Sequence, residues 1–255
     1  MISTRLYARA CTVIAVAGAL PFAIRAQSFK LDSAKGLTMH NAVAAPVTFK
    51  GKKAIKLTIA PEAAARFAAA AAPAGKKGGQ KKGGGPAGDG GRLDTLGIVD
   101  GVDFSNGTIE LDLTGEPDPG AGAQARGFVG VAFRVQPDRG TYDCFYLRPT
   151  NGRADDQERR NHSAQYIRHP DFTWFRMRAE TPSRYESYVD IRPAEWIHVK
   201  IEVDGDKARL FVDGRDQATL IVNDVKSGAS GKGGVALWFE GSTIAHYANL
   251  KITPR

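Results

Sequence analysis

The chain has 255 residues, of which 42% are hydrophobic, and it carries a formal net charge of +8. Residues 1–26 contribute +3 and residues 62–91 another +3, which leaves only +2 for the rest of the chain. A nucleic-acid binder concentrates its basic charge on the folded surface, so this distribution argues against a nucleic-acid partner.

The first 26 residues have the pattern of a secretion signal peptide. Arg5 and Arg9 precede an apolar run over residues 10–24, and the small residue Ala26 closes it just before Gln27. The run is too short to cross a bilayer, which takes about 20 apolar residues. We therefore expect export to the periplasm or the cell exterior, and a mature chain that has no transmembrane segment.

A shift in composition sets residues 62–91 apart from the rest. An alanine run over 63–72 leads into the sequence GKKGGQKKGGG, which cannot bury apolar surface. We expect a disordered loop inserted into a single domain that covers residues 27–255. Such an insertion costs the fold little, because loop-closure entropy grows slowly with loop length.

Short runs of alternating apolar residues make up most of the remaining chain. They cover residues 54–59, 108–113, 129–135, 145–147, 197–203, 210–212, 235–239 and 244–252. Period-two alternation in so many runs predicts an all-β, two-sheet antiparallel sandwich, with one face of each strand in the core. The pairs Asp204-Gly205 and Asp213-Gly214 indicate tight turns, since glycine accepts a positive φ. We expect the last run, 244–252, to be an edge strand.

Two segments carry a resemblance to a known superfamily. The segment Glu195–Gly214, EWIHVKIEVDGDKARLFVDG, resembles a recurrent piece of laminin-G-like and concanavalin A-like domains. The segment Gly233–Ile252, GGVALWFEGSTIAHYANLKI, resembles the closing strands of the same fold. The chain looks similar to secreted bacterial lectin/glucanase-like and 3-keto-disaccharide hydrolase-like domains, although the Asn-Ser-Gly strand motif of the latter is missing near Phe133.

The resemblance implies a jelly-roll sandwich that holds a glycan or oligosaccharide on its concave sheet. It also implies that calcium could be bound, as in lectins. The residues themselves indicate no cofactor and no metal site, because the sequence has neither a histidine pair at helical spacing nor a cysteine cluster. We accordingly expect no cofactor.

Side chains on the non-core face of the strands form the first part of the predicted site. They are rich in aromatic rings and arginine: Arg134, Tyr142, Tyr146, Arg148, Trp238 and Glu240. Aromatic faces stack on sugar C–H groups, while guanidinium and carboxylate groups bond to hydroxyls in fixed directions. We therefore predict that these residues bind substrate.

The polar stretch over residues 148–178 forms the second part of the predicted site. A connection of this length on a sandwich is uncommon unless it is functional. Its candidate ligand-binding residues are Asn151, Arg153, Asp155, His162, Gln165, Tyr166, His169 and Trp174. We predict that this stretch is one long loop facing Trp238.

Whether the chain is an enzyme stays open at the level of sequence. The retaining β-glucanases of this fold carry closely spaced carboxylates on one strand, but Glu110 and Glu116 lie about 20 Å apart along an extended strand. A glycoside hydrolase-like activity would instead need an acid or base from Asp155, Asp156, His162, His169 or Glu240. The alternative is a non-catalytic adhesion or scaffold module that binds a protein partner at the cell envelope, because protein interfaces also favour aromatic residues and arginine.

Overall fold

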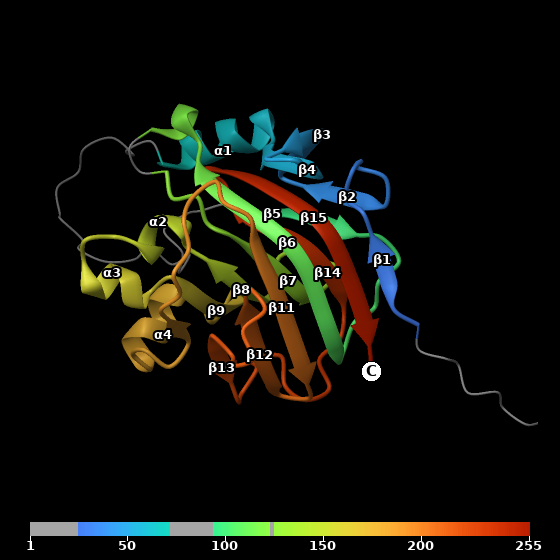
Figure 1. The fold of residues 1–255 in the computed structure, drawn as a ribbon, viewed down its shortest axis with the longest axis vertical. Coiled ribbons are helices and arrows are strands. Elements are labelled where there is room, and N and C mark those ends of the chain that lie inside the picture. Colours follow the sequence, from blue (N-terminus) through green and yellow to red (C-terminus); the bar gives the residue numbers. More distant parts are fainter. Residues whose placement is uncertain (1–24, 72–93, 123–124) are drawn as a thin grey trace, which may run out of the picture.

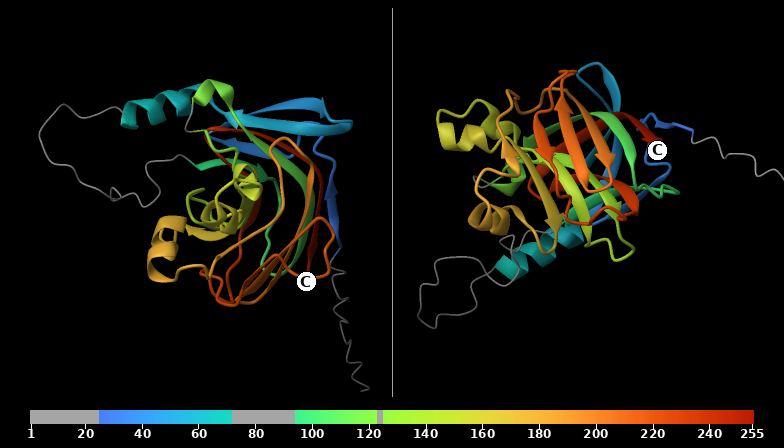
Figure 2. Two further views of the ribbon diagram at one scale, coloured as in Figure 1. Left: turned by 60° about the vertical axis from the view of Figure 1, so that its left-hand side comes forward. Right: turned by 90° about the horizontal axis from the view of Figure 1, so that it is seen from below.

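The computed structural model describes residues 25–71, 94–122 and 125–255, which form two antiparallel sheets packed face to face (Figures 1 and 2). The strands of the first sheet, sheet A, are in spatial order β13 (Leu220–Val222), β12 (Lys207–Val212), β11 (Ile197–Asp204), β6 (Gly107–Pro117), β15 (Thr243–Pro254), β4 (Lys52–Ile59) and β3 (Ala42–Phe49). The short strand β1 (Gln27–Phe29) also belongs to this sheet and pairs with β15. All of its pairings are antiparallel.

The second sheet, sheet B, has seven strands. In spatial order they are β10 (Glu186–Ser187), β9 (Ala164–His169), β8 (Tyr142–Leu147), β7 (Val129–Val135), β14 (Gly234–Glu240), β5 (Asp94–Val99) and β2 (Leu37–His40). Many spatial neighbours are distant in sequence, for example β7 and β14, as expected when a chain winds back and forth between two sheets. The prediction of an all-β, two-sheet antiparallel sandwich is confirmed.

Few helices accompany the sheets. They are α1 (Pro61–Ala71), η1 (Pro119–Ala121), α2 (Pro149–Gly152), α3 (Gln157–Asn161) and α4 (Trp174–Glu180). Helices α2, α3 and α4 gather at one side of the sandwich near β8 and β9, where Figure 2 shows them in yellow and gold. The expected loop over 62–91 starts inside α1, and its part beyond Ala71 lies outside the described residues, as do residues 1–24 of the expected signal peptide.

The core lies between the sheets and follows the alternation of the sequence. In sheet A, Ile109, Leu111 and Leu113 of β6 lie directly opposite Ile201, Val199 and Ile197 of β11, and all six are buried. Each such side chain contributes roughly 1.5–3 kcal/mol by leaving water. The sheets meet closely at Gly97, where an added Cβ would lie 3.1 Å from Cδ1 of Leu57.

The two sheets differ in their outer faces. Strand β11 alternates buried and more exposed residues, whereas every residue of β7 and β8 is buried. The outer face of sheet B, which turns away from sheet A, is therefore covered along these strands.

Two expectations about the strands are wrong. Strand β15 is interior, because it pairs with β6 on one side and with β4 and β1 on the other, so it is not an edge strand. The stretch 148–178 is not one loop either, since Ala164–His169 forms β9 between β8 and β10. The first four residues of β9 are buried, so this strand is covered on both faces. The polar composition of the surrounding stretch gave no sign of it.

Candidate binding site

A row of side chains crosses the outer face of sheet B. Trp238, Gly130, Tyr146, Gln165 and Glu186 lie directly opposite one another on β14, β7, β8, β9 and β10. Because Gly130 has no side chain, the rings on either side of it meet, with centroids 4.8 Å apart. An added Cβ on Gly130 would lie 2.6 Å from Cβ of Tyr146, so the row requires glycine there.

The aromatic part of this row is covered instead of open. Tyr146 is 2% exposed and Trp238 is 4% exposed. The ring of Phe128 stacks on Tyr146 at 5.9 Å, and the guanidinium of Arg148 lies 5.3 Å from the Tyr146 ring centroid. The expected aromatic platform is thus a floor beneath other side chains, because a large ring is more stable out of water.

Arg148 joins the floor to the polar end of the row. It follows the last residue of β8, and its Nη2 donates to the Tyr146 hydroxyl at 2.8 Å and to Oε1 of Gln165 at 2.7 Å. Its Nη1 lies 3.8 Å from Oε1 of Glu186. The side chain is 7% exposed, and its Nε is buried without a hydrogen-bond partner.

Glu186 is the anionic centre of this region, and its side chain is only 3% exposed. Arg178 donates to both carboxylate oxygens, with Nε 3.1 Å from Oε2. Nδ1 of His162 lies 2.9 Å from Oε2, although the two groups are not aligned for a hydrogen bond. A buried carboxylate needs such cationic partners, because the loss of its hydration costs several kcal/mol.

His162 stays neutral at neutral pH in these surroundings. Burial lowers the pKa of its imidazole, and the positive charges of Arg178 and Arg148 lower it further, although Glu186 and the exposed Glu158 act in the opposite direction. A neutral imidazole can accept one hydrogen bond as well as donate one.

Above this row lies a pocket of about 440 Å³, which we call the arginine pocket. Its lining residues are Arg126, Phe128, Arg148, Asn151, Arg159, His162, Trp174 and Arg178. Trp174 opens α4, and the guanidinium groups of Arg178 and Arg148 lie 4.9 and 5.7 Å from its ring centroid. Helices α2 and α3 supply Asn151 and Arg159, which contact each other at 3.4 Å.

The structure brings some of the predicted site residues together in this pocket. Arg148, Asn151, His162 and Trp174 line it, and Tyr146, Gln165 and Trp238 belong to the row beneath it. Sequence reasoning missed Arg126, Phe128, Arg159 and Arg178 as lining residues. Arg159 and Arg178 lie within the predicted stretch, so their positive charge was a usable signal, whereas Phe128 and Arg126 lie before β7 and gave none.

Other predicted residues lie elsewhere in the structure. Arg153 binds Asp190 through two hydrogen bonds beside a separate cavity, and Asp155 is exposed. Tyr166 lies on the inner face, where its hydroxyl donates to Asp143 at 2.6 Å. Tyr142 is fully buried and accepts from Nε1 of Trp238, while His169 stacks on Tyr142. Glu240 accepts from the backbone N–H of Ser242 at the end of β14.

Arg134 has a structural role in place of the predicted binding role. Its φ is +54°, and its side chain is completely buried. The guanidinium donates to the backbone oxygens of Ser105, Gly205 and Gly228 at 2.8–3.1 Å. These bonds hold three loops together at the end of the sandwich, and they leave Arg134 inaccessible to a ligand.

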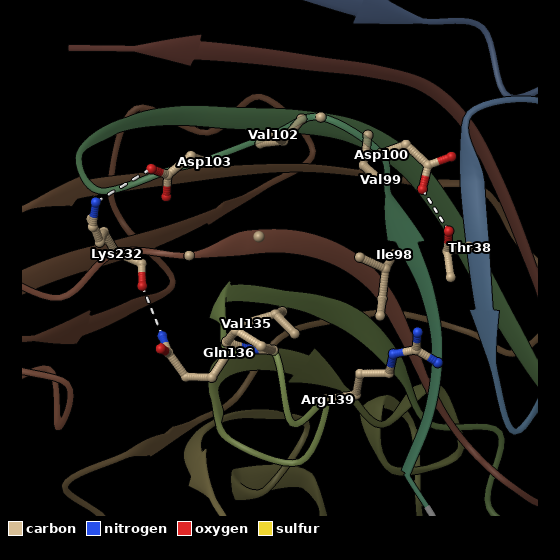
Figure 3. A pocket seen from close by; sticks show the side chains of 14 residues that line it. Thr38, Ile98, Val99, Asp100, Val102, Asp103, Val135, Gln136, Arg139 and Lys232 are labelled. Atoms are coloured by element: carbon tan, nitrogen blue, oxygen red, sulfur yellow. Dashed lines mark hydrogen bonds and ion pairs between the residues drawn. The ribbon is translucent and has the colours of Figure 1, made fainter.

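A larger cavity, of about 630 Å³, lies at the other end of sheet B (Figure 3). We call it the β5–β7 cavity, and its lining residues are Thr38, Ile98, Val99, Asp100, Gly101, Val102, Asp103, Val135, Gln136, Pro137, Arg139, Lys232, Gly233 and Gly234. Thr38 donates to Asp100 at 2.7 Å, and Lys232 pairs with Asp103 at 3.6 Å. No aromatic ring is among these residues, so the sequence pattern gave no signal for the cavity.

The described residues, 25–71, 94–122 and 125–255, show neither a cluster of metal-binding side chains nor a membrane-spanning helix. No three His, Cys, Asp or Glu residues within these ranges come together to hold a metal ion. No helix within residues 25–71, 94–122 and 125–255 has the length and apolar character needed to cross a membrane.

Comparison with known proteins identifies the fold. Neither a protein-family model nor a curated protein matches the sequence. Among solved structures, the carbohydrate-binding module CBM66 from Bacillus subtilis matches with a TM-score of 0.50 at 15% identity, over 85% of this chain and 95% of that one. The fold is a concanavalin A-like jelly roll.

A second solved structure agrees. A Bacillus subtilis protein of unknown function with a galectin-like fold matches with a TM-score of 0.51 at 12% identity, over 90% of this chain and 96% of that one. The jelly-roll sandwich expected from Glu195–Gly214 and Gly233–Ile252 is therefore confirmed as the fold. At such low identities the likeness concerns the jelly roll, and function has to be argued from the site.

Proposed function

We propose that this chain is a carbohydrate-binding domain that holds a glycan in the arginine pocket. The observation that carries the proposal is the lining of that pocket, in which the rings of Phe128 and Trp174 stand beside directional donors such as Asn151 and Arg159. Sugars are recognised by this combination of apolar rings and fixed hydrogen-bonding groups. The fold shared with a carbohydrate-binding module supports the same function.

Binding is favoured over glycoside hydrolysis by the position of the carboxylates. Most glycoside hydrolases use two carboxyl groups that flank the scissile bond. None of the described residues that line the pocket is Asp or Glu. The nearest buried carboxylate, Glu186, is held by Arg178 and Arg148 beneath the pocket and is only 3% exposed.

The test uses the full chain and two matched tryptophan variants. Trp174→Ala removes the ring in the pocket, and Trp196→Ala removes a similarly half-buried ring whose Nε1 donates to the backbone of Phe49 beside sheet A. On a glycan array followed by calorimetric titration, we expect Trp174→Ala to lose affinity by about fivefold or more, since one ring contact contributes about 1 kcal/mol beyond its area. Trp196→Ala should bind like the unmodified protein.

Two outcomes contradict the proposal. Equal losses in both variants would show that the pocket is not the glycan site. No glycan binding, together with a stoichiometric envelope protein recovered on the chain, would favour the adhesion or scaffold alternative. Thermal unfolding of both variants controls for loss of folding.

Export is a separate part of the proposal. It rests on the pattern of Arg5, Arg9 and the apolar run that ends near Ala26. Expression in the parent cell should deliver the protein outside the cytoplasm with a new N-terminus at Gln27, which N-terminal sequencing of the fractionated protein would reveal. An intact N-terminus on cytoplasmic protein would contradict it.

A further inference from the structure

The charges of the arginine pocket are unbalanced. Four guanidinium groups line it, from Arg126, Arg148, Arg159 and Arg178, and none of the described lining residues is acidic. The buried Glu186 offsets only one of the three charges of Arg148, Arg159 and Arg178, and Glu158 at the rim is 87% exposed. A guanidinium does not lose its proton in a protein, so this excess of positive charge persists at every physiological pH.

The arginines also have donors left for a ligand. A guanidinium has five N–H groups in a planar fork. Arg178 uses Nε and Nη2 for Glu186, which among the described residues leaves Nη1 for other bonds. Among the described residues, the guanidinium of Arg159 makes long contacts, 3.5 Å to the oxygen of Thr150 and 3.4 Å to Oδ1 of Asn151, and its side chain is exposed.

The ring of Trp174 packs against two of these arginines. The guanidinium groups of Arg178 and Arg148 both lie within 6 Å of its centroid, at 4.9 and 5.7 Å, which is the range of a cation–π contact. Phe128 holds Arg148 in the same way at 5.1 Å. The rings therefore fix the direction of the cationic forks, and a planar anionic group fits such forks through paired hydrogen bonds.

From this geometry we propose that the arginine pocket selects a negatively charged sugar, one that carries a carboxylate or a sulfate. The inference rests on the proposed glycan-binding function and adds the class of ligand. Both anions offer two or more oxygens to a guanidinium fork, so the pocket chemistry is shared by uronic acids and sulfated sugars. His162 complements it, because a neutral ring can donate to an anion or accept from a neighbouring hydroxyl.

The experiment uses the full chain with short oligosaccharides in matched pairs. Each pair is an acidic tri- to hexasaccharide and its neutralised counterpart, a uronate against its carboxyl-reduced form and a sulfated sugar against its desulfated form. Inorganic sulfate alone is a further ligand. The variants are Arg159→Gln in the pocket and Arg209→Gln, which removes an exposed charge from β12 of sheet A.

We expect the acidic member of at least one pair to bind about tenfold tighter than its neutral partner, as one charge-assisted hydrogen bond provides. Arg159→Gln should abolish most of that difference, and Arg209→Gln should keep it. The uronate and sulfate pairs show which anion is preferred. Affinity for the acidic member should also fall as salt is added, because salt screens exposed charges.

Three results would overturn the inference. Neutral members that bind as tightly as acidic ones would leave the glycan-binding function standing and remove the charge selectivity. Inorganic sulfate that binds as tightly as the sulfated sugar would show an anion site without sugar recognition. If no oligosaccharide of the panel binds, the proposed function fails together with the inference.

Discussion

The arginine pocket and the β5–β7 cavity differ in how their charges are used. The β5–β7 cavity is larger, 630 Å³ against 440 Å³, but its acids are already engaged: Asp103 pairs with Lys232 and Asp100 accepts from Thr38. Beneath the arginine pocket, the one buried carboxylate of Glu186 lies against three partners, Arg148, His162 and Arg178. We propose the smaller pocket as the binding site, because specificity comes from directional groups whose charge is not already satisfied.

The comparison is tested most strongly by removing one acid from each region. Glu186→Gln leaves Arg148, Arg178 and His162 around a neutral amide, and breaking a buried ion pair costs about 3 kcal/mol or more of the free energy of unfolding. Asp103→Asn removes an acid that is 68% exposed, which should cost less than about 1 kcal/mol. Urea unfolding of the two variants measures both values.

If the two variants lost similar amounts of free energy of unfolding, the prediction would be contradicted, because Glu186 would then lie in a solvated environment. The amide in Glu186→Gln keeps the volume of the side chain. The difference between the variants therefore reports charge and not packing.

His162 provides the next test, through pH. The lowered pKa of its imidazole means that the free pocket holds a neutral ring at pH 7, while a bound anion favours the protonated ring. Binding of a sulfated oligosaccharide then takes up a proton as the pH falls toward that pKa, and its affinity should rise by about fivefold between pH 7.5 and 5.5. The sulfate ester keeps its charge over this range.

His162→Gln should give an affinity that does not change with pH, and a flat profile in the unmodified protein would refute the prediction.

The free energy of unfolding should fall as the pH falls, whereas the affinity rises. The unfolded chain, with an ordinary imidazole, binds more protons near pH 6, so the folded state loses stability as the pH falls from 7 toward the lowered pKa. Titration followed by ¹H–¹⁵N NMR of the ring would assign both effects to His162.

The sequence was sufficient for the fold because the period of two is a local signal. Ile109, Leu111 and Leu113 alternate on β6, and the same alternation on β11 places its own apolar residues opposite them. The position of β15 was not predictable in this way. An alternating pattern indicates which face is buried, but it does not say how many neighbours a strand has.

The site was predictable only where the strands are regular. Tyr146 and Trp238 were placed on the correct face, but Tyr146 is covered by Phe128 and Arg148, and a pattern within one strand does not reveal such contacts. Arg134 was misplaced for a different reason. Its positive φ interrupts the alternation at the end of β7, so its side chain turns toward the loops instead of following Trp238.

The smallest expected effect concerns the β5–β7 cavity itself. Lys232 is 71% exposed and its partner Asp103 is 3.6 Å away, so Lys232→Gln should change the free energy of unfolding by less than about 0.5 kcal/mol. Glycan affinity should change by less than about twofold, since a solvated ion pair offers a ligand little that water does not. Calorimetric titration beside Arg159→Gln measures the contrast. If Lys232→Gln removed binding and Arg159→Gln did not, the larger cavity would be the glycan site, and excess charge would be the wrong criterion for locating it.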